Sequence, residues 1–135
     1  MPDTSRGVVH HLKQSKDQGV HVAFVELVGG YIGKAQPSSS AFVFGYGAGI
    51  ISGALISCGY EIHRVRPQTW MKAFSMKTRE GESKTSWKNR LKSLAEDLFP
   101  SIKVTLDTAD ALLIAEFGRR WMNGNITVDL SGDET

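Results

Sequence analysis

The spacing of apolar residues predicts two strands in the first half of the chain. Residues 20–28 are almost continuously apolar and rich in β-branched and aromatic side chains, which is typical of a strand covered on both faces. Residues 60–66 alternate between apolar and polar, which predicts a second strand that is more exposed on one face. A small strand is also predicted over residues 126–130, before a polar tail, residues 131–135, whose composition favours disorder.

Helical periodicity accounts for most of the remaining chain. Most of the predicted helices begin at a capping residue or a proline, and most end near a glycine or before a proline. They are a first helix from Asp3 or Thr4 to Asp17, a long helix from Ser38–Ser40 to Cys58, a short helix from Pro67 to Phe74, a helix over Lys84–Leu98, and a final helix from Asp107 to Gly124. The intervening residues 29–37 and 75–83 lack periodicity and predict loops.

This order of strands and helices predicts an α/β fold. Two strands do not make a stable sheet on their own, and the apolar strand over residues 20–28 needs neighbours on both edges. Three sources of further strands are open: a partner chain, the segment over residues 126–130, or strands that precede Met1.

The bulk composition is that of one soluble globular domain of 135 residues, with 41% hydrophobic and 22% charged residues. A net charge of +2 is too small to indicate a nucleic-acid partner, so the local distribution of charge must carry that argument. The single cysteine, Cys58, excludes a disulfide framework and is expected to be a buried thiol. Residues 1–18 lack the apolar core of a signal peptide, and residues 41–58 predict a buried helix instead of a membrane span. We therefore expect an intracellular protein.

Gly45, Gly49 and Gly53 recur every four residues along the long predicted helix. They do not match the dinucleotide-binding fingerprint, which would need a third glycine at position 50 and a preceding strand. Because an isolated glycine costs about 1 kcal/mol in a helix interior, we interpret the three as a stripe that lets the helix pack closely on a strand or another helix. The four histidines and Cys58 have no metal-ligand spacing.

Asp107 and Asp110 open the final helix three positions apart, on the same side and one turn apart. Two like charges at this spacing repel each other unless the helix dipole, a basic side chain or a divalent metal compensates them. One interpretation is structural, with Asp107 as the N-cap and Asp110 at the third helical position of a capping-box variant. The other is a metal site, which requires a further carboxylate from elsewhere in the chain.

Glu26 is the candidate for that further carboxylate. It stands near the carboxyl end of the apolar strand, where ligands bind in open α/β sheets. A strand-exit residue that faces solvent is the alternative interpretation. Three converging carboxylates would suit Mg²⁺ or Mn²⁺. A two-metal site of this kind supports phosphodiester hydrolysis.

Basic residues concentrate between the second strand and the final helix. The cluster is accompanied only by Glu80 and Glu82, and the aromatic residues Trp70, Phe74 and Trp87 are interleaved with it. Any one of its residues alone indicates a solvated face, but together they would supply phosphate contacts. The cluster comprises Lys72, Lys77, Arg79, Lys84, Lys88, Arg90 and Lys92. Tyr31, in the glycine-rich loop after Glu26, is a further candidate for stacking on a base.

Several stretches between Val20 and Trp121 occur in a characteristic order. They are Ala23-Phe24-Val25-Glu26, residues 44–59, Val65-Arg66-Pro67-Gln68-Thr69-Trp70-Met71-Lys72, Lys84 with Lys88, Ala95-Glu96-Asp97-Leu98-Phe99-Pro100, and Asp107-Thr108-Ala109-Asp110-Ala111-Leu112. In this order and spacing they resemble the RuvC-type Holliday junction resolvases of the ribonuclease H-like superfamily, in particular their short bacterial and phage members.

The resemblance implies a ribonuclease H-like fold and a two-metal endonuclease that acts on branched DNA as a homodimer. Glu26, Asp107 and Asp110 match three of the four acidic metal ligands of that family. The fourth, an aspartate on the family's first strand, has no counterpart. We therefore expect a member that lacks the leading strands, with one nuclease domain over residues 1–125 and a short strand or tail over residues 126–135.

The resemblance also implies the partners. The residues expected to contact DNA are Tyr31, Lys72, Lys77, Arg79, Lys84 and Lys88, and dimerisation is expected through the Ser40–Cys58 helix. The protein would then be bacterial or phage-encoded, cytoplasmic and without a membrane partner. Two other functions remain open: a DNA-binding or assembly module that keeps the fold but has lost a metal ligand, and a nuclease of the same superfamily that acts on structured RNA.

Overall fold

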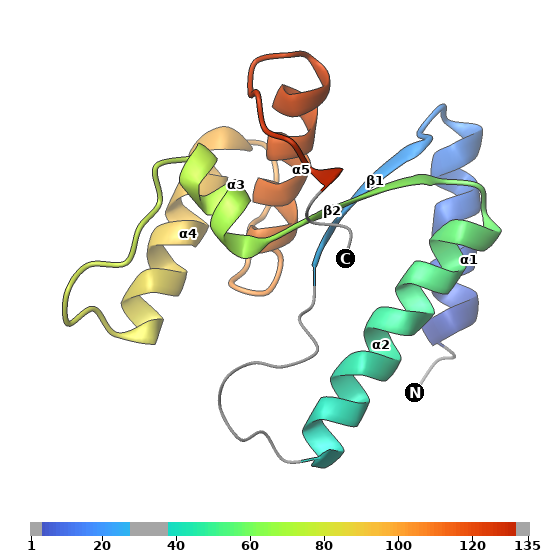
Figure 1. Ribbon diagram of the computed structural model, residues 1–135, viewed down its shortest axis with the longest axis horizontal. Coiled ribbons are helices and arrows are strands. Elements are labelled where there is room, and N and C mark those ends of the chain that lie inside the picture. The colour runs from blue at the N-terminus through green and yellow to red at the C-terminus, as the bar shows by residue number, and fades with distance from the viewer. Residues whose placement is uncertain (1–3, 28–37, 132–135) are drawn as a thin grey trace. The chain divides into compact units, whose positions relative to one another are not determined.

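The computed structural model describes residues 4–27 and 38–131, and it has a mixed α/β architecture (Figure 1). Its described elements, in chain order, are α1 (Thr4–Asp17), β1 (Val22–Glu26), α2 (Ser38–Ser57), β2 (Glu61–Val65), α3 (Pro67–Ala73), α4 (Lys84–Leu98) and α5 (Ala109–Met122). The predicted α/β class is confirmed at this level, and the boundaries of α1, α2 and α4 agree with the sequence to within a residue or two. The loop predicted over residues 29–37 lies outside the described residues.

Strands β1 and β2 pair in a two-stranded parallel sheet. The backbone N–H of Glu61 donates to the carbonyl of His21 at 2.9 Å, where the two strands begin. All five residues of β1 are half-buried, so the prediction of a strand covered on both faces is wrong for the described structure. The apolar sequence favours a strand at β1. Burial of both faces of the strand requires other elements packed on each face, which the described residues do not supply.

The chain divides into two compact units, Met1–His63 and Arg64–Thr135. In the first unit, α1 packs against α2. The Tyr60 hydroxyl donates to the carbonyl of Leu12 at 2.6 Å, and the Lys16 ammonium donates to the carbonyl of Cys58 at 2.6 Å. Gly59 has a φ of +78°, which ends α2 as predicted and leaves room for the Lys16 side chain. These bonds hold the end of α2 against α1.

Helix α2 is more exposed than the sequence predicts. Tyr46 and Ile56 are each 64% exposed, whereas Ala54 and Leu55, near the end of the helix, are buried. A side chain added at Gly49 or Gly53 would meet no atom within 4 Å. Among the described residues of this one chain, no element packs closely on Gly49 or Gly53, so close packing of the stripe on another helix stays a prediction; the surroundings of Gly45 lie outside the described part.

The second unit is built around aromatic and aliphatic side chains from its helices. Trp70 of α3, together with Leu113 and Phe117 of α5, is completely buried. Helix α5 packs against both α3 and α4. Pro67 begins α3, and the Ser83 hydroxyl caps α4 by accepting a hydrogen bond from the Ser86 backbone N–H at 3.1 Å.

The segment after α5 is not a strand, so the prediction over residues 126–130 is wrong. The Trp121 indole N–H donates to the carbonyl of Val128 at 2.8 Å, and Leu130 is 4% exposed. The segment is thus held against its own unit by one side-chain hydrogen bond and one buried leucine, and it has no neighbouring strand among the described residues. The tail that the sequence predicts to be disordered lies outside the described residues beyond Ser131.

The second unit contains an ion cluster on α5 that also contacts the end of α3. Glu116 accepts hydrogen bonds from Arg119 at 2.7 and 2.9 Å and from Arg120 at 3.0 Å. The Arg120 guanidinium lies 4.9 Å from the centre of the Phe74 ring at the end of α3. These contacts lower the pKa of Glu116 to about 2, chiefly through the bond to Arg119.

We expect Glu116→Gln to lower stability in a pH-dependent manner. The folded-state pKa lies below the unfolded value of 4.5, so the carboxylate stabilises the fold above about pH 4.5, and this contribution is lost as the pH falls toward about 2. Because Arg119 is largely exposed, we discount the effect to about 1–2 kcal/mol near neutral pH. Urea unfolding of both proteins across this pH range tests it. A difference that persists unchanged at low pH would contradict the ionic explanation.

Candidate metal and nucleic-acid site

Asp107 and Asp110 lie at the start of α5, but neither residue caps the helix. The backbone N–H of Thr108 donates to the Thr105 hydroxyl at 3.2 Å, and the backbone N–H of Thr105 donates to the Thr108 hydroxyl at 3.0 Å. The carbonyl of Thr105 also accepts a hydrogen bond from the Ala109 backbone N–H at 3.0 Å. Thr105 and Thr108 thus close the turn that precedes α5, and Thr108, the residue before the helix, makes no side-chain capping bond.

The structural interpretation of Asp107 as the N-cap and Asp110 as its partner is therefore wrong. The residue before α5 is Thr108, and Asp110 is the acidic residue in the first turn of the helix. Both aspartates are exposed, and neither hydrogen-bonds another described side chain. Because neither carboxylate makes a capping bond to α5, both remain available to a ligand.

Asp110 has an unusual electrostatic setting at this helix end. Partial loss of hydration against the protein raises the pKa of its carboxyl, and the ammonium of Lys88, from α4, opposes that rise. The carboxyl is thus destabilised as an anion while remaining accessible on the surface. A positive charge brought to this position would be stabilised by it.

Glu26 ends β1 and is half-buried, so it is not the freely solvated strand-exit residue of the alternative interpretation. It belongs to the first compact unit, whereas Asp107 and Asp110 belong to the second. Within residues 4–27 and 38–131, no group of three or more His, Cys, Asp or Glu side chains is placed to hold a metal ion. The set of Glu26, Asp107 and Asp110 remains a prediction.

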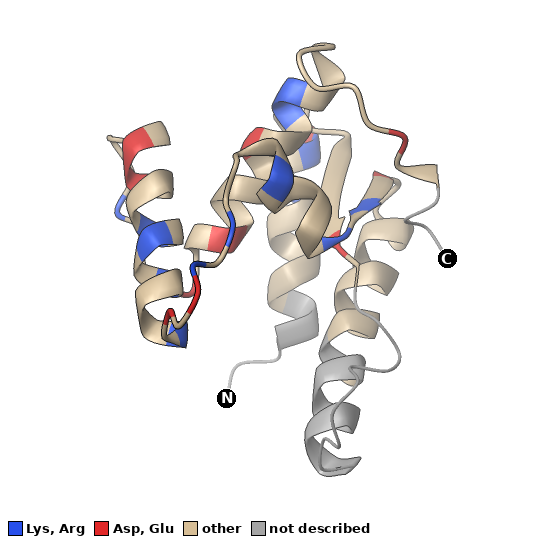
Figure 2. Cartoon of the chain, turned by 60° about the vertical axis from the view of Figure 1, so that its left-hand side comes forward, with Lys and Arg blue, Asp and Glu red and all other residues tan. Residues whose placement is uncertain are grey.

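Figure 2 shows where the Lys and Arg residues lie along the chain. The basic cluster divides into residues with and without an ion pair among the described residues. The exposed members form no ion pair with any other described residue, and they lie on α3, on α4 and in the segment between these helices. These members are Lys72, Lys77, Arg79, Lys84 and Lys88. Arg90, in contrast, is paired with Glu82 at 2.7 Å. Free cations on adjacent elements are what binding of a phosphate backbone requires.

The aromatic residues interleaved with this cluster take different roles. Trp70 is completely buried, so it belongs to the core and not to a nucleic-acid surface. Phe74 lies beneath Arg120, and the Trp87 ring lies 5.3 Å from the Arg90 guanidinium. Tyr31 lies outside the described residues. Trp87 is therefore the aromatic residue of this set that is placed on α4 beside the free lysines.

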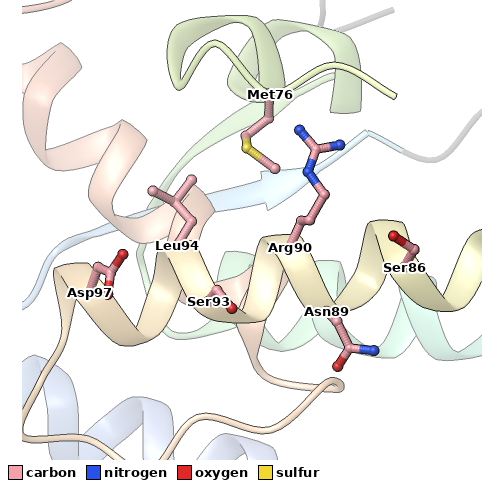
Figure 3. A pocket seen from close by; sticks show the side chains of 7 residues that line it. All are labelled: Met76, Ser86, Asn89, Arg90, Ser93, Leu94 and Asp97. Atoms are coloured by element: carbon pink, nitrogen blue, oxygen red, sulfur yellow. The ribbon is translucent and has the colours of Figure 1, made fainter. Parts of the chain in front are cut away.

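A groove of about 570 Å³ runs beside α4 and was not anticipated from the sequence. The side chains of Met76, Arg90 and Leu94 point toward one another across it (Figure 3). Its other lining residues are polar: Ser86, Asn89, Ser93 and Asp97. No spacing in the sequence indicates this groove, because Met76 comes from the segment before α4 and meets the helix only after folding.

The chain matches no protein-family model and no curated protein. The resemblance to the RuvC-type resolvases therefore rests on the matching stretches of its sequence. None of the helices in the described residues has both the length and the apolar character needed to cross a membrane.

Proposed function

We propose that this protein binds branched DNA and hydrolyses it as a divalent-metal-dependent endonuclease of the RuvC-type lineage, with a ribonuclease H-like fold. The observation that carries the proposal is the pair of exposed carboxylates of Asp107 and Asp110, which make no capping bond to α5, together with the positive charge of Lys88, which acts on Asp110. Metal ligands next to phosphate-binding cations are the minimal parts of a nuclease that positions and hydrolyses a phosphodiester.

The chemistry of the carboxylates fits a divalent cation. Asp107 and Asp110 are oxygen donors on one turn of helix, and the raised pKa of Asp110 reflects a carboxylate that would gain from a nearby positive charge. Glu26 completes the proposed ligand set. A bound Mg²⁺ or Mn²⁺ pair would supply an activated water and stabilise the leaving oxygen.

The chain's own residues would hold the substrate. Lys84 and Lys88 follow one another at four-residue spacing along α4, and Lys72 lies on α3, so their ammonium groups offer phosphate contacts from two helices. Lys77 and Arg79 extend the same charge into the segment before α4. A branched DNA presents several closely spaced phosphate backbones, which suits cations spread over several elements.

A second function, a DNA-binding module without catalysis, is favoured by one observation. The described residues contain no assembled group of three metal-ligating side chains. A protein that kept its basic surface and lost a metal ligand would bind junctions without cutting them. RNA cleavage by the same site is the third possibility.

Incubation with labelled four-way DNA junctions, linear duplexes and structured RNA, each with Mg²⁺ or Mn²⁺, tests the proposal. We expect cleavage of the junction and little cleavage of the duplex. Binding without cleavage would support the non-catalytic module, and preferential cleavage of RNA would redirect the proposal to an RNA substrate. A chain that neither binds nor cuts any of the three would overturn it.

We further propose that two copies of the chain dimerise through α2. This helix has no charged residue along its 20 positions, and it exposes Tyr46, Ile51 and Ile56. A charge-free helix with exposed large apolar side chains is typical of an interface between subunits. The glycines at positions 49 and 53, with open space around them, would let the backbone of a second copy approach.

Ile56→Glu is expected to convert this dimer into a monomer. A carboxylate placed within an apolar interface must be desolvated, which we expect to weaken dimerisation at least about a hundredfold. Light scattering at a series of concentrations measures it. Ile102→Glu is the matched control, since Ile102 is also exposed, at 47%, but lies in the other unit. A wild-type protein that is monomeric at high concentration would refute this interface.

A further inference from the structure

Glu82, just before α4, is the hub of a hydrogen-bond network. Its Oε1 accepts from the Arg79 backbone N–H at 3.0 Å and from Arg90 Nη1 at 2.7 Å. Its Oε2 accepts from the Ser86 hydroxyl at 2.9 Å. The side chain is 4% exposed, although the segment around it lies on the surface. A carboxylate that is covered in this way and accepts hydrogen bonds from three donors is part of the packed structure and not a solvated surface charge.

The network fixes the path of residues 77–82, which we call the basic segment. Arg79 and Glu82 close a turn, in which the Glu82 backbone N–H donates to the Arg79 carbonyl at 3.0 Å and Gly81 has a φ of +72°. Arg90 Nη1 also donates to the carbonyl of Lys77 at 3.1 Å. One guanidinium from α4 therefore ties the start of the basic segment to the carboxylate at its end.

The same bonds leave the cationic side chains of the basic segment unengaged. Glu82 binds the backbone of Arg79 and not its guanidinium, and Arg90 binds the backbone of Lys77 and not its ammonium. The side chains of Lys77 and Arg79 are both exposed, and neither forms an ion pair within the described chain. Arg90 itself neutralises the negative charge of Glu82, so the carboxylate does not draw the free cations inward.

We propose that Glu82 is a positioning residue that preorders the basic segment for contact with nucleic-acid phosphates. The inference rests on the proposed function, since it names how the same cationic surface is prepared for its ligand. A loop that is ordered before binding does not lose conformational entropy on binding, so its phosphate contacts contribute more fully to affinity. Glu82 strengthens binding of a polyanion despite its own negative charge.

The sign of one substitution separates this role from simple electrostatics. Glu82→Ala deletes the hub and one negative charge from a basic surface. Electrostatics alone predicts tighter binding of a four-way DNA junction, whereas loss of preordering predicts about three- to tenfold weaker binding. Glu80→Ala is the matched control, because it removes the same charge from an exposed neighbour without a described partner, and we expect unchanged or slightly tighter binding.

Limited digestion with trypsin tests the order of the segment without any nucleic acid. Lys77 and Arg79 are cleavage sites, and we expect Glu82→Ala to be cut there at least about fivefold faster than wild type, because cleavage requires local opening. Arg90→Lys keeps the net charge but removes Nη1, the atom that donates to both the Glu82 carboxylate and the Lys77 carbonyl. We expect weaker junction binding and faster digestion of this variant as well, and it replaces Glu82→Ala in the test in case that variant does not fold. Thermal melting of each variant verifies folding.

The outcomes distinguish the two proposals. The wild type could fail to bind junctions while Glu82→Ala is digested faster than the wild type. That result would overturn both the proposed function and the positioning role, but it would still show that Glu82 orders the segment. Junction binding by wild type that becomes tighter in both Glu82→Ala and Glu80→Ala would overturn the positioning role alone. Equal digestion of wild type and Glu82→Ala would also overturn it.

Discussion

Replacing Asp107 with asparagine is expected to abolish cleavage of a four-way DNA junction and to leave junction binding intact. Asn keeps the size of the side chain but removes the charge that a divalent cation needs, and Asp107 makes no capping bond to α5 that the substitution would remove. We expect the cleavage rate to fall at least about a thousandfold, equivalent to about 4 kcal/mol of transition-state stabilisation. Single-turnover cleavage with Mn²⁺ and a parallel binding measurement provide the two readouts.

Glu96→Gln is the matched control for this experiment. Glu96 is an exposed carboxylate near the end of α4, without an ion pair among the described residues. The Glu96→Gln variant should cleave and bind the four-way junction as the wild type does. Unfolding of Asp107→Asn is measured in parallel, because an unfolded variant would also lose cleavage. An unchanged cleavage rate in this variant would exclude Asp107 as a metal ligand.

Trp70→Ala is expected to be the most destabilising single substitution among those considered. Trp70 is the largest of the completely buried side chains, on the helix that packs against α5 beside the equally buried Phe117. Truncation of a buried tryptophan removes its transfer free energy and leaves a cavity, which together cost about 3–5 kcal/mol. Chemical denaturation monitored by circular dichroism measures the change in the free energy of unfolding.

Trp87→Ala provides the comparison for the same truncation at a half-buried site. Its ring contacts the Arg90 guanidinium, and its loss should cost about 1 kcal/mol. The difference between the two variants in the free energy of unfolding measures the effect of burial, separately from the loss of a tryptophan side chain. Similar costs for both would contradict the assignment of Trp70 to the core and would reopen an aromatic role for it in the basic cluster.

Much of the local structure was predictable because its causes are close in sequence. Ser83 as the cap of α4, Pro67 at the start of α3, and the left-handed Gly59 and Gly124 that follow α2 and α5 all act within one helical turn. Periodicity likewise located β1 and β2. The start of α5 is the exception, since the aspartate pair favours Asp107 as a cap, whereas Thr108 precedes the helix and makes no side-chain capping bond.

The environments of the candidate site residues were not predictable in the same way. Trp70 lies between basic residues in the sequence but is buried, and the stretch that reads as a buried helix exposes Ile56. Sequence proximity grouped Arg90 with the free cations, whereas folding pairs it with Glu82. Each of these environments depends on which elements pack together. The pattern of apolar residues in a sequence shows which residues share one face of a helix or strand, but not which element covers that face.

The sequence alone determined where the helices and strands lie, the carboxylate pair at the start of the last helix and the run of cations before it. Short-range hydrogen bonding and side-chain periodicity are sufficient causes for these. Folding decided that Asp107 and Asp110 make no capping bond, that Lys88 acts on Asp110, and that Glu82 accepts hydrogen bonds from Arg79, Ser86 and Arg90. These features depend on side-chain geometry or on contacts between elements, which hydrophobic periodicity does not encode.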